Sequence, residues 1–565
     1  MKKWKKAVST IVIALMCLTL LAACGNKGDS TTETSSSPAA SSSTGSSPAP
    51  SGGTSSVAPP SPAETGQEPD LGGGDLPVDE TATFAEEIEV IIDNNSVFAI
   101  NPFVVGAQGP GSTWAYTMMY DRLLFSTTDI NVQDPGLAVE WYTDDWTTFT
   151  VKLREGVYFQ NGEKFTADDV VFTCNYAKEF PGTPAVNSTW QYVDSVTALD
   201  DYTVEFNTGT VNVNFIFYLQ NPSAVIVNEK AIMDDPEKGV WVGTGPYILT
   251  DFVANNYWVL ERNDNFWGEP PVTRKITYRF VPEISNRTIA LLNGEAQLCM
   301  KVSPEDMEIF EDNPDWTVFD RVINNPNPLV FNMDDPITGD YNFRMAVLYA
   351  IDREDLAIAY NGNYGLAAND PGTLWGRYTQ FRNLDIPFIP QDLDLAREYL
   401  EKSTYNGETL EVVAAAMGQI NATPVFQQQL EAIGIHTEIK VMEQAAMPAY
   451  TAWGNNQIQM YLSNMGTTFN ASFFRSLVYP GSPTNSSGYN NPEVTDLIDR
   501  AMVETDIGER EQLWREVQRI VGEDPPFTNL FWIVETVVGA KGIGGFSWNT
   551  DAVYNMRNLY WQIDA

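Results

Sequence analysis

Few residues of this 565-residue chain could carry out covalent or metal chemistry. The single histidine, His436, follows Ile433-Gly434-Ile435 at a turn between an expected helix and an expected strand, where a solvated structural role is favoured. The sequence has no G-x-S-x-G, no G-x-x-x-x-G-K-[ST] and no EF-hand spacing, which excludes those hydrolase, nucleotide-binding and calcium-binding motifs. Acid pairs such as Asp168-Asp169 and Asp334-Asp335 could do glycosidase work, but among 74 acidic residues such neighbours more often cap helices. We therefore expect no catalytic residue, no metal site and no cofactor.

The acidity of the chain limits its partners. With 33 Lys and Arg against 74 Asp and Glu, the formal net charge is −41, and such a surface repels nucleic acid and anionic lipid headgroups. The acidity could attract cationic ligands or could serve only solubility. Cys174 and Cys299 lie far apart in the sequence, and they could form a disulfide, although two buried free thiols are favoured. No nucleic-acid partner is expected.

The first 25 residues have the pattern of an export signal. Lysines at positions 2 to 6 precede an apolar run from Ile11 to Leu21, which is too short to span a membrane. The following Ala22-Ala23-Cys24 resembles the lipobox of bacterial lipoproteins, in which the cysteine receives a lipid and becomes the mature N-terminus. The alternative is an ordinary secretory signal with a cysteine there by chance. We expect a signal peptide over 1–23, lipid on Cys24, and a protein anchored by lipid at the extracellular face of the bacterial cell membrane.

Residues 24–83 and 84–565 differ sharply in composition. The first segment is rich in Ser, Thr, Pro and Gly and has too few large apolar side chains to offset chain entropy, so a disordered linker is expected. The second is too long for one core and implies two or three domains. Alternating apolar residues, as in Phe149-Val151-Leu153 and Ile276-Tyr278-Phe280, predict strands, whereas Thr166 with Asp169 predicts a capped helix start. Because such elements interleave, the fold class is mixed α/β.

Several segments of residues 84–565, which we call the head, resemble one protein family, the bacterial extracellular solute-binding proteins of family 5, which serve peptide- and nickel-type ABC importers. The most specific stretch, Phe149 to Phe172, is similar to the family signature almost end to end, with Asn161 in place of an aspartate. The other segments follow in family order, so that the resemblance covers essentially the whole head. They are Tyr120–Phe125, Pro135–Trp141, Gly243–Tyr247, Arg262–Gly268, Asn293–Ala296, Phe343–Arg353, Gln427–Ile435 and Gly488–Val494.

The resemblance implies a two-lobe clamshell of the periplasmic-binding-protein (type II-like) fold, with an extra domain in the first lobe. By analogy, lobe I takes 84–322 and 535–565, with the extra domain at about 120–240, and lobe II takes 323–534. The implied function is to capture a small solute between the lobes, an oligopeptide or dipeptide by family, and to deliver it to the permease subunits of an ABC importer. The protein is expected to act as a monomer.

The same resemblance implies which residues line the ligand cleft. In peptide binders of the family an aspartate holds the ligand's ammonium, but Thr468 falls at that point and no acid lies nearby in the run. Because a buried ammonium without a counter-charge is costly, the ligand either lacks a free amine, as an oligosaccharide does, or is a peptide anchored by another acid. The expected ligand-binding residues are Asn101, Phe103, Trp375, Asn464, Met465, Thr468 and Phe469.

Two other functions remain open at this point. A secreted glycosidase would use one of the acid pairs, and it would turn over a glycan substrate. A surface sensor or adhesin would keep the clamshell without a permease. Because the family resemblance covers essentially the whole head, the transport receptor is the preferred interpretation.

Overall fold

The computed structural model describes residues 82–92, 100–103, 110–127, 133–180, 189–222, 224–372, 375–377, 379–415, 419–443, 446–451, 456–460, 471–548 and 554–564. All of them belong to the unit that runs from Gln67 to Ala565. The predicted signal peptide, Cys24 and most of the predicted linker lie outside the described residues.

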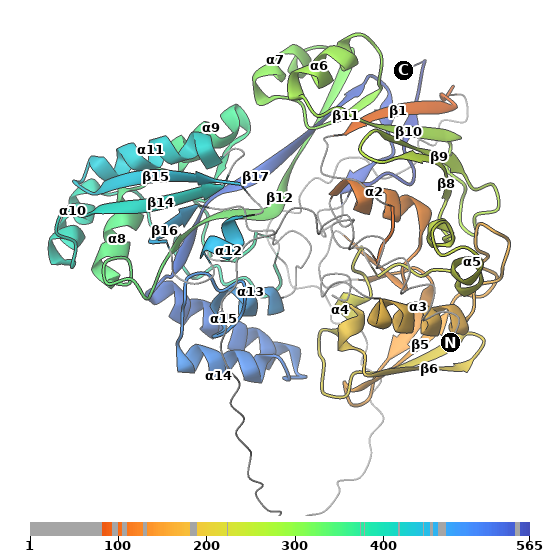
Figure 1. Ribbon diagram of the computed structural model, residues 1–565, viewed down its shortest axis with the longest axis horizontal. Coiled ribbons are helices and arrows are strands. Elements are labelled where there is room, and N and C mark those ends of the chain that lie inside the picture. Colours follow the sequence, from red (N-terminus) through yellow and green to blue (C-terminus); the bar gives the residue numbers. More distant parts are fainter. Residues whose placement is uncertain are drawn as a thin grey trace, which may run out of the picture. The chain divides into compact units, whose positions relative to one another are not determined.

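An 11-stranded mixed sheet organises this unit (Figure 1). Its strands follow the order β15-β14-β16-β12-β17-β11-β1-β10-β9-β8, and β13 pairs with β17 beside this path. The bounds are β1 (Glu87–Ile92), β8 (Tyr247–Val253), β9 (Tyr257–Arg262), β10 (Lys275–Phe280), β11 (Leu298–Met300), β12 (Trp316–Phe331), β13 (Leu366–Ala367), β14 (Thr409–Ala415), β15 (His436–Met442), β16 (Ile458–Met460) and β17 (Phe527–Ala540).

Two long antiparallel strands, β12 and β17, belong to both ends of this sheet, and we call them the crossing strands. Residues 316–322 of β12 pair with 534–540 of β17, beside β11. Residues 326–330 pair with 527–532, and there β12 also pairs with β16. The register shifts between Val322 and Pro326 and again between Asn327 and Pro328. Such shifts interrupt the ladder of hydrogen bonds and bend a strand. They lie where one end of the sheet passes into the other.

Helices cover the two ends of the sheet and form separate cores. At the β11 end, α6 (Ile284–Leu292) and α7 (Glu308–Glu311) pack on Ile91 and Val538. At the other end, Phe343, Phe426 and Phe531 belong to one core, which lies under α8 (Tyr341–Ala350), α9 (Arg353–Asn361), α10 (Leu393–Lys402) and α11 (Gln419–Glu431). A further core involves α13 (Ser472–Val478), α14 (Pro492–Ala501) and α15 (Ile507–Glu523).

A smaller four-stranded sheet lies inside the predicted extra domain, in the order β4-β5-β7-β6. Its strands are β4 (Ala138–Tyr142), β5 (Thr148–Leu153), β6 (Ser195–Asp200) and β7 (Thr203–Asn207), and α3 (Ala167–Glu179) contacts β6 and β7. The predicted helix start is confirmed, since the Thr166 amide donates to the Asp169 carboxylate at 3.0 Å. The predicted strands over 149–153 and 276–280 are confirmed as β5 and β10.

The remaining elements are short. They are α2 (Pro110–Met119), α4 (Phe215–Tyr218), α5 (Glu229–Asp234), α12 (Met447–Thr451), β2 (Leu124–Ser126), β3 (Gln133–Pro135), β18 (Ile543–Gly544), β19 (Ser547–Trp548), β20 (Tyr554–Asn555) and β21 (Tyr560–Trp561), with 3₁₀ turns at Trp190–Tyr192, Gly239–Trp241, Pro304–Asp306 and Gly362–Tyr364.

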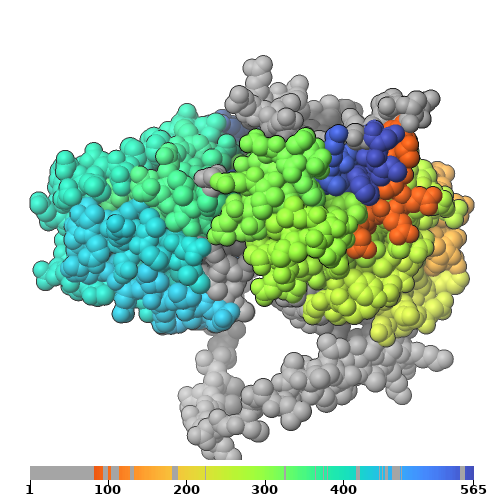
Figure 2. Space-filling model, turned by 90° about the horizontal axis from the view of Figure 1, so that it is seen from above, coloured from red at the N-terminus to blue at the C-terminus, as the bar shows by residue number. Residues whose placement is uncertain are grey.

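The two ends of the described chain meet. The Thr83 amide donates to the Asp564 carboxylate at 3.2 Å, and the Ala85 amide donates to the Trp561 carbonyl at 2.9 Å. Figure 2 shows the C-terminal residues in dark blue against the first described residues in orange. Cys174 and Cys299 are both buried and form no disulfide with each other, as the sequence favoured. None of the helices in the described part is long and apolar enough to cross a membrane.

Candidate functional site

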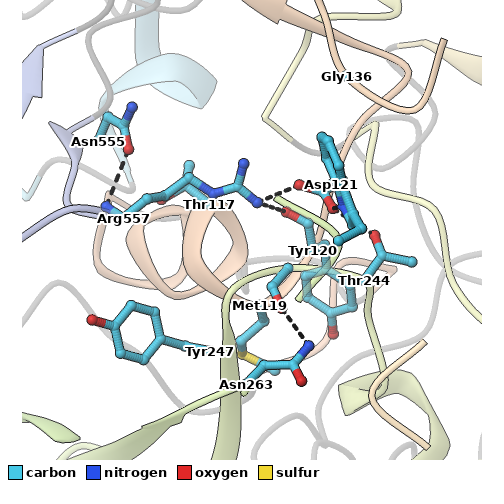
Figure 3. Close-up of polar contacts among 12 residues, drawn as sticks. Thr117, Met119, Tyr120, Asp121, Gly136, Thr244, Tyr247, Asn263, Asn555 and Arg557 are labelled. Carbon is cyan, nitrogen blue, oxygen red and sulfur yellow. Dashed lines mark hydrogen bonds and ion pairs between the residues drawn. The ribbon is translucent and has the colours of Figure 1, made fainter. Parts of the chain in front are cut away.

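A buried ion pair joins four segments of the chain (Figure 3). Asp121 follows α2 and is fully buried, and one of its carboxylate oxygens pairs with the Arg557 guanidinium. Its other oxygen accepts from the Thr244 hydroxyl at 2.9 Å and from the Trp267 indole at 2.7 Å. These residues come from three segments that carry the family resemblance and from the C-terminal segment. Their role here is to hold the first part of the head together.

The glycines of the 243–247 turn allow a close approach to the end of α2. A Cβ on Gly243 would lie 2.2 Å from the Met119 carbonyl oxygen, and one on Gly245 would lie 2.6 Å from that of Met118. The Gln160 amide group donates to the Met119 carbonyl at 2.9 Å and so fastens the signature stretch to the same place. Both glycines are therefore required by packing.

Two arginines of the 343–353 segment hold β17 and the residues just before it. Arg344 donates to the Pro525 carbonyl at 3.1 Å and pairs with Asp524. Arg353 donates to the Asn529 carbonyl at 3.2 Å and makes bonds from both other guanidinium nitrogens. Burial lowers the pKa of Arg353 to about 10. The residues that carry the resemblance are thus largely scaffold, and ligand contacts must be sought elsewhere.

Asn101 and Phe103 lie together beside α3. The Asn101 side-chain oxygen accepts from the Phe103 amide at 2.9 Å. The Phe103 ring is 2% exposed and packs edge-on against Tyr176, with the ring centroids 4.9 Å apart. The structure gives each residue a local structural partner. Their role as ligand contacts stays a prediction.

Trp375 is placed in a core. It is fully buried, its indole donates to the Gln380 carbonyl at 3.0 Å, and its ring lies 4.3 Å from that of Phe474 and 5.8 Å from that of Trp514. The family resemblance selected this residue as part of the cleft lining, and the structure packs its ring in a core. Its role as a ligand contact stays a prediction. Asn464, Met465, Thr468 and Phe469 lie outside the described residues.

A charged pair on the crossing strands was missed from the sequence. Arg321 and Glu535 are direct register partners, and Arg321 is 8% exposed. The Tyr554 hydroxyl donates to a Glu535 oxygen at 2.7 Å, and the Trp114 ring meets the Tyr554 ring edge-on at 5.3 Å. The sequence did indicate this pair, because an arginine and a glutamate each stand inside a strand-like run and charged residues are rarely buried unless they are paired.

A loop between β13 and α10 carries a second set of charges. Asp370 pairs with Arg382 and accepts from the Trp532 indole, which belongs to β17, at 3.1 Å. Burial alone would raise the pKa of Asp370, but the charge of Arg382 and the bonds from Arg382 and Trp532 outweigh it and hold this pKa below its usual range. The loop is thereby fastened to a crossing strand. Arg377, in the same loop, is half-buried.

The described residues offer little to acid–base or metal chemistry. No group of three or more His, Cys, Asp or Glu side chains in the described ranges could hold a metal ion. The His436 ring is half exposed, with its Nδ1 atom 3.0 Å from a Glu431 oxygen. Asp335 accepts from the Ile337 and Thr338 amides, and Asp169 serves the start of α3. One acid of each pair considered for a glycosidase therefore accepts from backbone amides.

The model of the bacterial extracellular solute-binding proteins, family 5 Middle, matches residues 133–486, which is more than half of the sequence. The chain belongs to this family. The glutathione-binding protein GsiB of Escherichia coli (strain K12) is 26% identical over 430 residues, covering 73% of this chain and 83% of the relative. GsiB of Pectobacterium atrosepticum is 24% identical over 437 residues, covering 74% and 83%.

Solved structures of the family share the fold. The substrate-binding protein CtaP of Listeria monocytogenes superposes with a TM-score of 0.76 at 23% identity, over 85% of this chain and all of that chain. DppA of Helicobacter pylori, in complex with the peptide STSA, has a TM-score of 0.70 at 23% identity, over 86% and 100%. The predicted family and periplasmic-binding-protein fold are confirmed.

Family membership also settles the class of function. The protein is a non-enzymatic solute-binding protein of an ABC importer, and it acts on the extracellular or periplasmic side. The lobe boundaries, the ligand-binding residues and the lipid on Cys24 stay predictions.

Proposed function

We propose that this family member is a lipid-anchored receptor that binds short peptides between two lobes and delivers them to the permease of its ABC importer. Relatives with known ligands support the peptide class, because their names and titles give the peptide STSA, the dipeptide Met-Leu and glutathione. Nickel complexes of histidine, bound by a more distant structure of the same fold, are the neighbouring possibility.

The observation that carries the proposal is the break in the ladder of the crossing strands. Lobe I would be 84–322 with 535–565, including the extra domain at about 120–240, and lobe II would be 323–534. Both boundaries fall beside the register shift between Val322 and Pro326. Hinges of this kind absorb domain closure in a few residues, and closure over a ligand excludes water from it. Micromolar binding requires about 8 kcal/mol, which enclosed apolar contacts and a few hydrogen bonds can supply.

The missing acid at Thr468 bears on how a peptide is held. Glu535 offers another carboxylate, since it is partly buried on a crossing strand and already accepts a bond from Tyr554. We assign to Glu535 the role of holding the ligand's ammonium. The second candidate is a ligand without a free amine, such as an oligosaccharide, and the absence of an acid near Thr468 favours it.

Calorimetric titration of the full chain, purified in detergent, would test the proposal. The panel comprises free tripeptides, the same peptides with an acetylated amine, glutathione, nickel with histidine, and oligosaccharides. Tighter binding of the free than of the acetylated peptides supports the proposal, and this preference should fall in Glu535→Gln. Binding of the sugars alone would support the second candidate, and no binding to any member would refute both.

The anchor has a test of its own. Wild-type cells should keep the protein in the membrane fraction with a diacylglyceryl mass on Cys24, whereas Cys24→Ala should release it from the membrane. Retention of Cys24→Ala in the membrane, with no lipid found on the wild type, would show an ordinary secretory signal instead.

A further inference from the structure

We propose that Tyr364 and Glu311 form a contact behind the crossing strands, which we call the latch, that favours the open receptor and breaks when the lobes close over a ligand. The latch would therefore set ligand affinity without touching the ligand. This inference rests on the proposed function, because it needs two lobes that close. It is drawn from a contact outside the candidate ligand site, between two residues that carry no part of the family resemblance.

The latch connects the two ends of the large sheet. Tyr364 follows α9, a helix of the core that contains Phe531. Glu311 is the last residue of α7, which packs in the core that contains Val538. The Tyr364 hydroxyl donates to a Glu311 carboxylate oxygen, and its ring packs against the Val538 core. Tyr364 thus lies in proposed lobe II by sequence, but its side chain contacts proposed lobe I.

The turn that carries Tyr364 lies beside the break in the crossing strands. The Asn361 side-chain amide donates to the Tyr364 carbonyl at 3.2 Å and to the Val534 carbonyl of β17 at 3.3 Å. Val534 pairs with Val322, the last residue of β12 before the register shift. Because hinges absorb domain closure in a few residues, a rotation at this break changes the distance between Tyr364 and Glu311.

The latch and Glu535 lie on opposite faces of the crossing strands. The register is continuous between residues 316–322 and 534–540, and successive side chains of a strand point to opposite faces. Val318 and Val538 are register partners, and both contact the core where Tyr364 packs. Glu535, three positions from Val538 along β17, consequently faces the other way, where Tyr554 donates to it. The latch is therefore behind the face that carries the proposed ammonium site.

The chemistry of the latch suits a contact that forms and breaks. Burial, the bond to Glu311, and the charges of Glu311 and Asp320 raise the pKa of Tyr364, so its hydroxyl stays protonated and remains a donor. Tyr364 is half-buried and Glu311 is exposed, so water can replace the bond when the two groups separate. Because opening the latch exchanges its bond for bonds to water, the latch opposes closure by about the net strength of one hydrogen bond.

The position of the latch gives the direction of its effect. When two lobes rotate about the strands that join them, groups on the ligand side approach each other and groups on the opposite side separate. A contact behind the strands is thus better formed in the open state, and the ligand must supply the energy that breaks it. Removing this contact raises the closed population, and the apparent affinity rises with the fraction of molecules that can bind.

The test compares peptide binding by variants of the latch. Calorimetry on the full chain in detergent would use free tripeptides. Tyr364→Phe keeps the ring in the core and removes only the hydroxyl, and it should bind about 2- to 10-fold more tightly than the wild type, which corresponds to one hydrogen bond. Glu311→Ala should give a similar gain, and the double variant should gain no more than either single variant.

Tyr257→Phe is the matched control. It removes a tyrosine–carboxylate bond, 2.8 Å long, from Tyr257 of β9 to Asp251 of β8. These strands are neighbours at one end of the sheet, so their bond does not change when the lobes rotate. The affinity of Tyr257→Phe should equal that of the wild type.

The unliganded protein provides a second readout. Small-angle neutron scattering of the full chain, with the detergent contrast-matched, would measure its radius of gyration. Tyr364→Phe should be more compact than the wild type, whereas Tyr257→Phe should not. A loss of stability alone would produce neither compaction nor tighter binding.

Each outcome decides a different claim. Equal or weaker peptide binding by Tyr364→Phe would refute the latch while the peptide receptor stands, and so would an equal gain in Tyr257→Phe. A lower melting temperature of Tyr364→Phe with unchanged affinity would show that the bond only stabilises the fold. If the wild type binds no peptide, the proposed function fails, and scattering still decides the latch, since an unchanged radius of gyration in Tyr364→Phe refutes it.

Discussion

Replacing Asp121 by asparagine should strongly destabilise the head, although the two side chains have nearly the same shape. Asp121 is fully buried and accepts bonds from Arg557, Thr244 and Trp267, which are all donors. Asparagine has only one acceptor oxygen, so its NH₂ group must face either Arg557 or both of the other donors. In either orientation Arg557, whose side chain is 16% exposed, loses its counter-charge.

The size of this effect follows from the geometry. Removing one partner of a buried ion pair costs about 3–5 kcal/mol, because the other charge stays buried without compensation. The side-chain amide retains part of the hydrogen bonding, which keeps the loss within that range. Since a whole domain is stable by only about 5–15 kcal/mol, the variant should unfold well before the wild type in urea.

A local readout places the effect at the right contact. Amide hydrogen exchange should rise in the segment around Arg557 and in the turn that contains Thr244. Asp144→Asn, which removes the same charge from an exposed position, should leave urea unfolding within about 0.5 kcal/mol of the wild type. The double variant Asp121→Leu with Arg557→Met should recover much of the stability, since two apolar residues leave no unpaired charge. A wild-type urea transition for Asp121→Asn would refute the reasoning.

Three further predictions concern other buried groups. Burial raises the pKa of Asp169 to about 6, above its unfolded value of about 4, so the folded state binds the proton more tightly and this contribution to stability is lost as the pH rises from 4 to 6. Urea titrations should show the wild type losing stability relative to Asp169→Asn over that range. A constant difference in the free energy of unfolding would contradict the assignment. Arg353→Lys should lower the free energy of unfolding by about 1–3 kcal/mol, because one ammonium cannot span the carbonyls of Asn529 and Ile389 and the Thr528 hydroxyl, and thermal melting would measure it. Cys174 and Cys299 should react with a thiol reagent only after denaturation, because both are buried and burial raises the pKa of Cys174 to about 12. Mass spectrometry of labelled peptides would show this, and labelling of either residue in the native protein would contradict their burial.

The elements with strong local signals were predictable from the sequence. Alternation alone identified β5 and β10, and Thr166 with Asp169 marked the start of α3, because these signals depend on neighbouring residues only. The family resemblance supplied the fold that local patterns could not. It could not show that Asp121 meets Arg557, since that contact joins residues 436 positions apart.

The candidate site was harder to predict for a physical reason. An aromatic residue in a loop suits a ligand wall and a core equally, and only the tertiary contacts of Trp375 with Phe474 and Trp514 show that it is packed in a core. Glu535 has no motif either, and its register partner on β12 lies far away in the sequence.

The position of β17 has a consequence for export. This strand, formed by residues 527–540, lies between β12 and β11, and it is therefore needed before either half of the large sheet is complete. Asp121 can pair with Arg557 only after that later residue has been made. Contacts of such long range form slowly, and a chain emerging from the ribosome has no central strand until residues 527–540 have been made. This order of assembly fits the predicted export signal, because a secretion channel that accepts only unfolded polypeptide would receive a chain whose large sheet is still incomplete.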